Sequence, residues 1–450
     1  MFDLIVLGGG PGGYVAAIRA SQSGMRVLLI DKRKELGGTC LNVGCIPSKT
    51  LLQSSELYEK VIKEAETLGI KCESVQLHFD RLMEKKNEVI GGLVQGVSHL
   101  MQKNKIEVIQ GEGQLISPTT VLVGDKNYEG KNILLATGSA PIELPFIPFD
   151  EKKIISSTGA LSLSKLPKKL IIIGAGVIGV ELASVYCRLG ADVTIVEMLN
   201  QICPPLDLQI AKILQRSLEK QGIKFLLGKK VLSGKGATIE LEDQTLKGDH
   251  VLVAVGRMPY SKNLGLKKIG IQTDSRGFID VNGHFQTSVS SVYAIGDLIE
   301  GPMLAHKASE EGIAVIDHLT GKGGEINYMT IPNVIYTHPE VATVGLSEEE
   351  VKKGGLTPII GKAFLQGNAR ARASFATDGL VKIIGDKQSG RLLGLHICAS
   401  HASEMISIGA LAIKMGATVE QIAETPFAHP TLSEAIKEAA LAAIGKPLHG

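Results

Sequence analysis

One pattern of residues occurs twice in this chain, and it constrains the fold more than any other feature. Residues 4–7 and 170–173 are short apolar segments, each followed by a Gly-x-Gly-x-x-Gly loop, a helical pattern and a second apolar segment. A strand, glycine turn, helix and strand in this order form a βαβ unit. The sequence therefore predicts two Rossmann-like folds. Their equivalent positions share one offset of 166 residues: Gly8, Gly10, Gly13, Gly24 and Asp31 match Gly174, Gly176, Gly179, Gly190 and Glu197.

The glycine loops have the chemistry of a dinucleotide site. The first two glycines allow a tight turn and close approach of a pyrophosphate, the third lets the helix meet the sheet, and the helix N-terminus attracts negative charge. A single loop of this form also serves plain turns, but two copies in the full context favour nucleotide binding. Asp31 and Glu197 end the second strands, where a carboxylate accepts hydrogen bonds from ribose hydroxyls. No Arg or Lys occupies the three positions after Glu197, so the second site is predicted to prefer NAD over NADP.

Each unit also closes in a similar way. Residues 133–136 lead into Thr137-Gly138-Ser139, and residues 251–254 lead into Val255-Gly256-Arg257, with a shared offset of 118 residues. We interpret these turns as second cofactor contacts. Residues 141–264 are therefore predicted to be an inserted Rossmann fold, and the first fold must be completed later in the chain.

The completing segment is predicted at residues 291–295, a strand that ends in Gly296-Asp297 and precedes a helix reaching about Leu319. Asp297 is placed for a polyol hydroxyl, although a Gly-Asp pair is often only a turn. From about residue 329 the pattern changes to alternating strands and alanine-rich helices at 404–415 and 433–444. Their small residues fit an internal layer or a subunit interface, and both alternatives stay open.

Two cysteines lie just downstream of the first glycine loop. Cys40 and Cys45, with four residues between them, fall in the segment from Gly37 to Lys49. Such a pair is most often buried filler, but beside a nucleotide loop it suggests a flavin facing a disulfide. The other cysteines, Cys72, Cys187, Cys203 and Cys398, are predicted to be buried or inert.

Composition excludes several other classes of protein. The chain has 450 residues with 44% hydrophobic content, enough for roughly three domains with their own cores. Its net charge of +2 is spread over mixed signs, which makes nucleic acid an improbable partner. The longest apolar stretch, 170–187, is broken by glycines and Glu181, so no membrane span is predicted. An apolar segment starting at residue 4 leaves no room for a leader, and from this we expect a cytoplasmic, reducing location.

These motifs, together with the segment from His429 to Glu434 (His-Pro-Thr-Leu-Ser-Glu), occur in one order along residues 4 to about 445. That order resembles the pyridine nucleotide-disulfide oxidoreductases. The resemblance implies an α/β protein with two Rossmann-like dinucleotide-binding domains, for FAD (1–140) and NAD (141–264). It also implies a central domain that completes the FAD site (265–328) and a C-terminal α+β dimerisation domain (329–450). The expected assembly is a homodimer whose active sites are shared between subunits.

The resemblance also assigns roles to individual residues. Cys40 is expected to exchange with substrate sulfur and Cys45 to face the flavin, with Lys49 near the flavin and paired with Glu181. His429 is the expected base, because a thiolate is the nucleophile in such chemistry, and Glu434 would orient it. Two purely structural alternatives remain: Lys49 could be a solvated lysine on a helix surface, and residues 431–434 could form a helix capping box.

The remaining expected contacts follow the matching motifs. Those for FAD are Gly8, Gly10, Gly13, Asp31, Lys49, Gly113, Thr137, Gly138, Ser139, Asp297, Met303, Leu304, Ala305 and His306. Those for NAD are Gly174, Gly176, Val177, Ile178, Gly179, Glu181, Glu197, Val231 and Gly256. No metal is expected. The chain departs from the family pattern at Asp31, where a glutamate is often seen, and at Phe427, where a second histidine is common.

The implied activity is oxidation of protein-bound dihydrolipoyl groups through the Cys40/Cys45 disulfide and FAD, with hydride passed to NAD+. Implied partners are dihydrolipoyl-bearing acyltransferase or carrier proteins of 2-oxo acid dehydrogenase complexes or the glycine cleavage system, with a role in cell redox homeostasis. A reductase of another disulfide would favour NADP, and a mercuric reductase would need a cysteine pair beyond Cys398, the last cysteine here. A non-enzymatic scaffold is the alternative from a different class.

Overall fold

The computed structural model describes residues 1–449. Its first large sheet has seven strands, and its parallel part follows the order β3-β2-β1-β6, with β17 paired to the far side of β6. Because β17 lies far along the chain, residues after the insertion complete the first sheet, as the sequence predicted. The strands are β1 (Phe2–Leu7), β2 (Val27–Asp31), β3 (Glu107–Gln110), β6 (Lys126–Leu135) and β17 (Val292–Ala294).

A second parallel sheet repeats this arrangement in the order β11-β10-β9-β15-β8. All five strands come from the predicted insertion, residues 141–264, so the inserted fold has a sheet of its own. The strands are β8 (Ile154–Ile155), β9 (Lys169–Ile173), β10 (Asp192–Val196), β11 (Lys224–Leu226) and β15 (His250–Val253).

Antiparallel strands extend both folds and connect them. The first sheet continues into β4 (Gly113–Ser117) and β5 (Thr120–Val123), and the second fold carries a sheet of β12 (Val231–Lys235), β13 (Thr238–Leu241) and β14 (Thr245–Lys247). The chain leaves the first fold through β7 (Ser139–Pro141) and returns through β16 (Arg257–Pro259). These two short strands pair with each other, so both crossings lie side by side.

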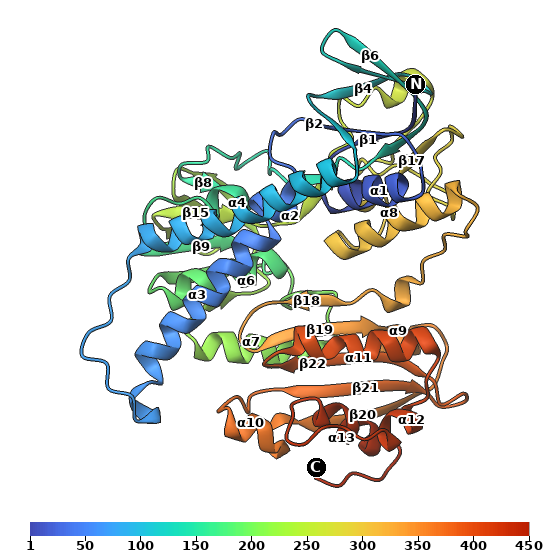
Figure 1. The fold of residues 1–450 in the computed structure, drawn as a ribbon. Coiled ribbons are helices and arrows are strands. Elements are labelled where there is room, and N and C mark those ends of the chain that lie inside the picture. Colours follow the sequence, from blue (N-terminus) through green and yellow to red (C-terminus); the bar gives the residue numbers. More distant parts are fainter. Residues whose placement is uncertain (450) are drawn as a thin grey trace.

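Helices pack closely on the first sheet. α1 (Pro11–Gln22) lies against α8 (Ala305–Leu319), as Figure 1 shows. A Cβ atom on Gly312 would lie 2.7 Å from the carbonyl oxygen of Gly12, so these backbones approach as closely as glycine allows. The segment after the insertion is therefore part of the first core.

The helices that carry Cys40 and Cys45 lie between the two nucleotide folds. α2 (Gly38–Val43) and α3 (Cys45–Lys63) follow the first fold, and α3 packs along α6 (Val177–Arg188) of the second fold (Figure 1). The other helices of the first two-thirds of the chain are α4 (Phe79–Lys103), α5 (Ser157–Ala160) and α7 (Leu208–Lys220).

The C-terminal part is a five-stranded antiparallel sheet in the order β18-β19-β22-β21-β20. α13 packs on β20 and β21, where a Cβ on Gly361 would lie 1.8 Å from the oxygen of Ala439, so its alanines form an internal layer. α11 packs on β19 and β22 but leaves Leu411 and Met415 exposed. The elements are β18 (Asn333–Ile335), β19 (Glu340–Gly345), α9 (Glu348–Lys353), β20 (Pro358–Phe364), α10 (Ala369–Ala373), β21 (Leu380–Asp386), β22 (Leu392–Ala399), α11 (Ala402–Met415), α12 (Val419–Glu424) and α13 (Glu434–Ala443).

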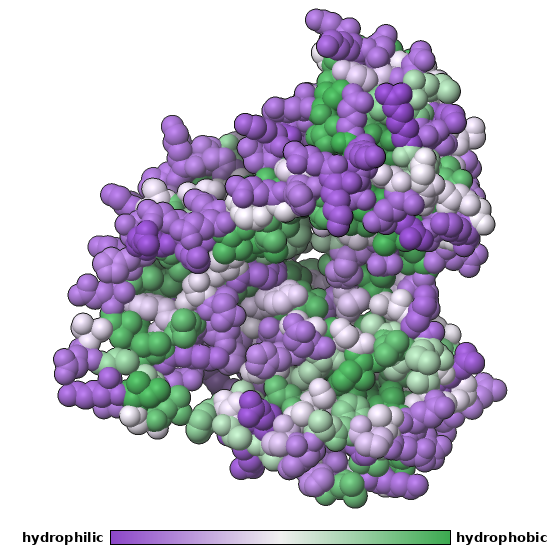
Figure 2. Space-filling model, viewed as in Figure 1, coloured by the Kyte–Doolittle hydropathy of each residue, from purple (hydrophilic) through white to green (hydrophobic). Residues whose placement is uncertain are grey.

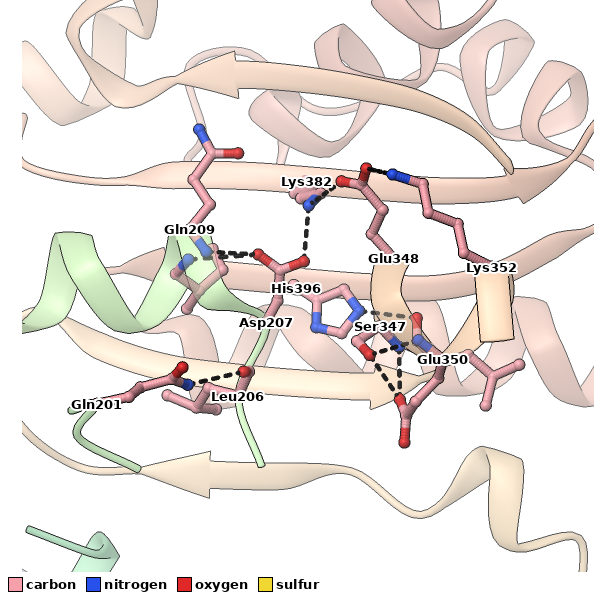
Figure 3. A network of polar contacts seen from close by, with 12 residues as sticks. Gln201, Leu206, Asp207, Gln209, Ser347, Glu348, Glu350, Lys352, Lys382 and His396 are labelled. Atoms are coloured by element: carbon pink, nitrogen blue, oxygen red, sulfur yellow. Dashed lines mark hydrogen bonds and ion pairs between the residues drawn. The ribbon is translucent and has the colours of Figure 1, made fainter. Parts of the chain in front are cut away.

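A buried ion network joins this sheet to the second nucleotide fold (Figure 3). The Lys382 ammonium of β21 donates to Asp207 at 2.6 Å and to Glu348 at 2.7 Å. Asp207 also caps α7, accepting a hydrogen bond from the backbone of Gln209 at 3.0 Å. The Asp207 side chain is fully buried and that of Lys382 is 2% exposed, so this contact is shielded from water.

On the face shown in Figure 2, hydrophilic side chains predominate and hydrophobic ones are interspersed. Among residues 1–449, none of the helices combines the length and the apolar character that crossing a bilayer requires.

Candidate redox and nucleotide-binding sites

The two glycine loops have the same geometry. Gly8 and Gly174 have φ values of 105° and 104°, in the region that favours glycine. A Cβ on Gly13 would lie 1.8 Å from the oxygen of Gly8, and one on Gly179 would lie 2.0 Å from that of Gly174. The third glycine of each loop is thus required where the helix turns back against the strand.

The acidic residues at the second strand ends occupy equivalent places as well. Asp31 accepts a hydrogen bond from the backbone of Gly9 at 2.6 Å, and Glu197 accepts one from Ala175 at 2.8 Å. Gly9 and Ala175 differ by the same 166 positions as the loops. Each carboxylate therefore lies beside its glycine loop, as a ribose-binding group must.

The two cysteines meet at the junction of α2 and α3. Cys40 lies on α2 and Cys45 is the first residue of α3, and both are free thiols in the structure. The hydrogen bond from Cys40 and the nearby Lys49 charge lower the pKa of Cys45 to about 7, although burial opposes this. The same hydrogen bond, together with burial, raises the pKa of Cys40. Cys45 is thus the more acidic thiol of the pair.

Lys49 is held at this junction by a buried carboxylate. Its ammonium lies 2.8 Å from Oε2 of Glu181 on α6, whose side chain is only 5% exposed. The other oxygen of Glu181 accepts a hydrogen bond from the Tyr336 backbone at 2.9 Å, and Lys49 lies over the Tyr336 ring at 4.6 Å. Burial works against the charged form, but Glu181 more than offsets it and raises the pKa of Lys49. Lys49 therefore stays cationic beside the thiols and is not a solvated surface lysine.

A second polar cluster forms where the two crossing strands meet the Gly296-Asp297 turn. The Ser139 hydroxyl donates to Asp297, and Arg257 donates to the hydroxyl and carbonyl oxygens of Ser139, both at 2.7 Å. Arg257 follows Gly256 in the second exit turn, a turn that the sequence singled out without assigning a function to the arginine. The cluster joins residues of both nucleotide folds.

The Gly296-Asp297 turn has a buried support that sequence analysis missed. Glu311 accepts a hydrogen bond from the Gly296 backbone at 2.7 Å, and Lys307 donates to the Gly296 carbonyl at 3.1 Å. Lys307 and Glu311 pair at 3.0 Å with side chains 1% and 0% exposed. Lysine and glutamate four residues apart normally mark a solvated helix face, so the pattern carried no signal for this role.

His429 and Glu434 form a pair at the start of α13. Nδ1 of His429 lies 3.0 Å from Oε1 of Glu434, and the Thr431 backbone donates to Oε2 at 2.8 Å. The Thr431 hydroxyl donates to Ala428 instead of closing a reciprocal capping box. Partial burial opposes ionisation of Glu434, but the bonds from Thr431 and His429 outweigh it and lower the pKa of Glu434. Glu434 thus orients the imidazole and also caps the backbone.

Within one chain, this pair and the cysteines lie apart. α13 is near the C-terminal end of the molecule, while α2 lies between the nucleotide folds (Figure 1). The His429 side chain is 72% exposed. The chain therefore brings Cys40, Cys45, Lys49 and Glu181 together but leaves the imidazole facing outward.

The other expected cofactor residues lie around the two loops or on flanking strands. Thr137 donates its hydroxyl to the backbone of Tyr260 at 2.8 Å, and His306 contacts the oxygen of Pro332 at 2.8 Å at the start of α8. Of the two states predicted for Cys72, buried or inert, burial does not hold: Cys72 is exposed, because it falls in an irregular segment between α3 and α4 that covers no core. The remaining residues are Met303, Leu304 and Ala305 at the N-terminus of α8, Gly113 on β4, Val231 on β12, Val177 and Ile178 at the start of α6, and Gly138 and Gly256 in the exit turns.

Comparison with known proteins identifies the class. The family model described as pyridine nucleotide-disulphide oxidoreductase matches residues 2–312, and the dimerisation domain of the same family matches residues 331–440. The chain belongs to the pyridine nucleotide-disulphide oxidoreductase family. This confirms the predicted fold class, with its two nucleotide folds and its C-terminal dimerisation domain.

Individual relatives narrow the comparison further. The chain is 49% identical to dihydrolipoyl dehydrogenase 1 of Arabidopsis thaliana over 99% of its length and 91% of the relative. It is also 49% identical to leghemoglobin reductase of Glycine max, over 99% of its length and 88% of the relative. Among solved structures, LpdA from Mycobacterium tuberculosis matches with a TM-score of 0.90 at 29% identity, covering 97% of this chain and 98% of that chain.

One prediction is wrong by these comparisons. The dihydrolipoyl dehydrogenases of Arabidopsis thaliana and Dictyostelium discoideum are named as mitochondrial, which points to mitochondria and not to the predicted cytoplasm. The prediction rested on the few residues before the first strand. They are weak ground for a compartment, because targeting segments are removed from mature chains.

Proposed function

We propose that this chain is a dihydrolipoyl dehydrogenase that uses FAD and NAD. Relatives of that name match it over nearly its whole length at 49% identity. The observation that supports the proposal is the thiol pair beside Lys49, a cation that the buried Glu181 carboxylate holds at 2.8 Å and that lowers the pKa of Cys45 together with Cys40. A thiol of low pKa is a good leaving group in disulfide exchange, which the oxidised pair needs.

The residues present fit the two cofactors. Both loops place backbone N–H groups at a helix N-terminus, and a Cβ on Gly176 would meet nothing within 4 Å, leaving open space at that N-terminus. We assign FAD to the first loop with Asp31, Lys49, the Ser139/Asp297 cluster and the start of α8. We assign NAD to the second loop with Glu197.

The preference for NAD over NADP has support beyond the acidic residue. Met198 and Leu199 follow Glu197 and are largely exposed, so no cation stands there to receive a 2′-phosphate. The backbone N–H of Lys229 donates to the backbone carbonyl of Glu197, but the Lys229 ammonium is paired with Asp243 at 2.6 Å. The side of the site where the ribose would bind is thus lined by one acidic and two apolar side chains, which suits a ribose hydroxyl and not a phosphate.

The thiol chemistry follows from the pair. A dihydrolipoyl thiolate attacks the Cys40 sulfur of the oxidised pair, the Cys40/Cys45 bond breaks, and Cys45 leaves as a thiolate. The second dihydrolipoyl sulfur then attacks the mixed disulfide, releasing oxidised lipoyl and leaving Cys40 reduced. Two electrons have passed from the substrate to the cysteines, and His429 accepts the thiol proton while Glu434 stabilises its charged form.

FAD, when bound, supplies two-electron transfer between the Cys45 thiolate and a nicotinamide. Lys49 holds positive charge beside that thiolate, and Glu181 holds Lys49 in place. Since His429 is distant from Cys40 within one chain, we propose that the imidazole serves the cysteines of a second copy. The dimerisation domain at residues 331–440 supports this arrangement.

The proposed physiological partners are dihydrolipoyl-bearing acyltransferase or carrier proteins. The test is reduction of NAD by dihydrolipoamide, followed together with the visible spectrum of the flavin. Cys45→Ser should retain FAD and lose NAD reduction, whereas Cys72→Ser, which removes an exposed cysteine, should keep full activity. Full activity of Cys45→Ser would refute the proposal.

A further inference from the structure

The helices that carry Cys45 and the second glycine loop are joined by ion pairs at both ends. At the active-site end, Lys49 of α3 pairs with Glu181 of α6 at 2.8 Å. At the far end, Nε of Arg188 on α6 lies 3.4 Å from Oε2 of Glu59 on α3. Arg188 follows Glu181 by seven residues, which is close to two turns, so both lie on one face of α6. The two pairs therefore occupy the same helix interface.

The sign of the charges alternates along this interface. α3 contributes the cation at the active-site end and carboxylates, Glu56 and Glu59, at the far end, while α6 does the reverse. A slip of α3 by two turns in one direction would place Lys49 against Arg188. A slip in the other direction would place Glu56 against Glu181. Both alternatives oppose like charges, so the pattern specifies a single register.

Burying the Arg188 guanidinium costs free energy that its ion pair with Glu59 compensates only in part. Its side chain is 1% exposed, and its three nitrogens have no hydrogen-bond partner among residues 1–449. Burial lowers the pKa of Arg188, and the Glu56 and Glu59 carboxylates oppose that shift. A buried charge of this kind adds little net stability, and its best-attested use is to specify register.

The far-end carboxylates also contact two lysines of α3 itself and one histidine from another segment. Glu59 accepts a bond from Lys63 at 2.7 Å, and Glu56 accepts one from Lys60 at 2.6 Å. His338 lies 3.5 Å from Glu56 and comes from the segment before β19. The far end of α3 thus presents two carboxylates to Arg188.

We propose that Arg188 is a positioning residue for the thiol chemistry: it locks α3 in register on α6 and so keeps Lys49 beside Cys45. The proposal rests on the proposed role of Cys45. The titratable and charged groups around Cys45 are Cys40 of α2, Lys49 of its own helix, Glu181 of α6 and Arg257 of β16. Only the Lys49/Glu181 pair among these shares the α3/α6 interface with Arg188.

The effect on the thiolate follows from Coulomb's law. For charges about 6 Å apart at an effective dielectric constant of about 20, each ångström of added separation raises the thiol pKa by about 0.3. In Arg188→Met, we expect the midpoint of the long-wavelength thiolate–flavin absorbance in dithiol-reduced holoenzyme to rise above the wild-type value, by about half a unit for an added separation of about 1.5 Å. Arg188→Lys keeps the charge but shortens its reach, and should show part of this rise.

Two further variants separate register from bulk charge. Lys60→Met removes one positive charge from the same end of α3 without touching α6, and should leave the midpoint unchanged. In a Lys49→Met background, Arg188→Met should cause no additional shift. A wild-type midpoint in folded Arg188→Met, an equal shift in Lys60→Met, or additive shifts with Lys49→Met would each overturn the proposal.

The measurement can also be made without the flavin signal. If Arg188→Met does not fold, Glu59→Gln removes the same contact from α3.

If the holoenzyme shows no thiolate band, the proposed function fails. The pKa of Cys45 is then read from the pH dependence of iodoacetamide labelling at Cys45 in Cys40→Ser protein, followed by mass spectrometry of that peptide. An Arg188→Met shift there supports the positioning role independently, and its absence rejects it.

Discussion

Lys382→Met tests the buried ion network between the second nucleotide fold and the C-terminal sheet. The substitution keeps a long apolar stem but removes the ammonium that bonds both Asp207 and Glu348. Asp207 is fully buried and keeps only its backbone bonds at the start of α7, at 3.0 and 3.4 Å. Glu348 is partly exposed and retains Lys352. The main cost is therefore an uncompensated carboxylate at position 207.

Breaking a buried pair from one side costs about 3–5 kcal/mol, and the remaining bonds to Asp207 place this case near the lower end, at about 3 kcal/mol. At about 2–4 °C per kcal/mol for a domain of this size, the unfolding midpoint should fall by about 6–12 °C. Lys352→Met is the matched control, since it removes a 60% exposed partner of Glu348 and should cost about 0–1 kcal/mol.

The assay is thermal unfolding followed by circular dichroism at pH 7, with equal cofactor loading in every variant. Lys382→Met/Asp207→Asn should recover most of the loss, because asparagine still caps α7 and carries no charge. Equal midpoints for Lys382→Met and Lys352→Met would refute the reasoning. So would a double variant as unstable as the single one.

The same network predicts how the stability difference between wild type and Lys382→Met depends on pH. Hydrogen bonds from Lys352 and Lys382 lower the pKa of Glu348 to about 2. A carboxylate with a lowered pKa stabilises the fold above its unfolded value of about 4.3, and this stabilisation is lost as pH falls toward about 2. Bonds to Asp207 and Glu348 outweigh burial and raise the pKa of Lys382, so the lysine contribution is lost only in strongly alkaline solution. The gap between wild type and Lys382→Met should therefore narrow below about pH 4.3.

Two further predictions concern the nucleotide loop and the imidazole. Gly179→Ala should destabilise the protein, because the added Cβ would lie 2.0 Å from the Gly174 oxygen; Gly176→Ala, with nothing within 4 Å, should keep the unfolding midpoint but raise the KM for NAD. Equal midpoints for these two variants would contradict the packing argument. Glu434→Ala should lower kcat for dihydrolipoamide oxidation on the order of 10²-fold with FAD content unchanged, since it releases the His429 ring and the Thr431 backbone. Wild-type kcat in Glu434→Ala would remove the imidazole from the proposed mechanism.

The parts of the fold set by local patterns could be predicted from the sequence. Each βαβ unit is encoded within about thirty residues, and the third glycine of each loop is dictated by backbone contact within the same unit. The constant offset of 166 residues also predicted that Asp31 and Glu197 are equivalent, and the two carboxylates make equivalent hydrogen bonds. The expected pairing of Lys49 with Glu181 came from the family resemblance, because periodicity does not connect residues 132 positions apart.

The supporting contacts were not predictable for the same reason. Lys382 and Asp207 are 175 residues apart, and nothing in either segment marks a buried charge. Arg188 ends an ordinary helix pattern, and Lys307 and Glu311 resemble a solvated pair. Such residues gain their roles only when distant segments pack together, so each required the structure.

The pairing of β7 with β16 has a consequence for how such a chain can be altered. The inserted fold begins and ends at two adjacent strands, so its removal would leave neighbouring chain ends on the first fold, where a short turn could join them. A nucleotide module bounded in this way can be exchanged as a unit. The first fold contacts it at the same two strands, whatever the number of residues between them. Ser139 and Arg257 lie on these two strands, and a graft that keeps both residues preserves the hydrogen bonds between them at the junction of the two modules.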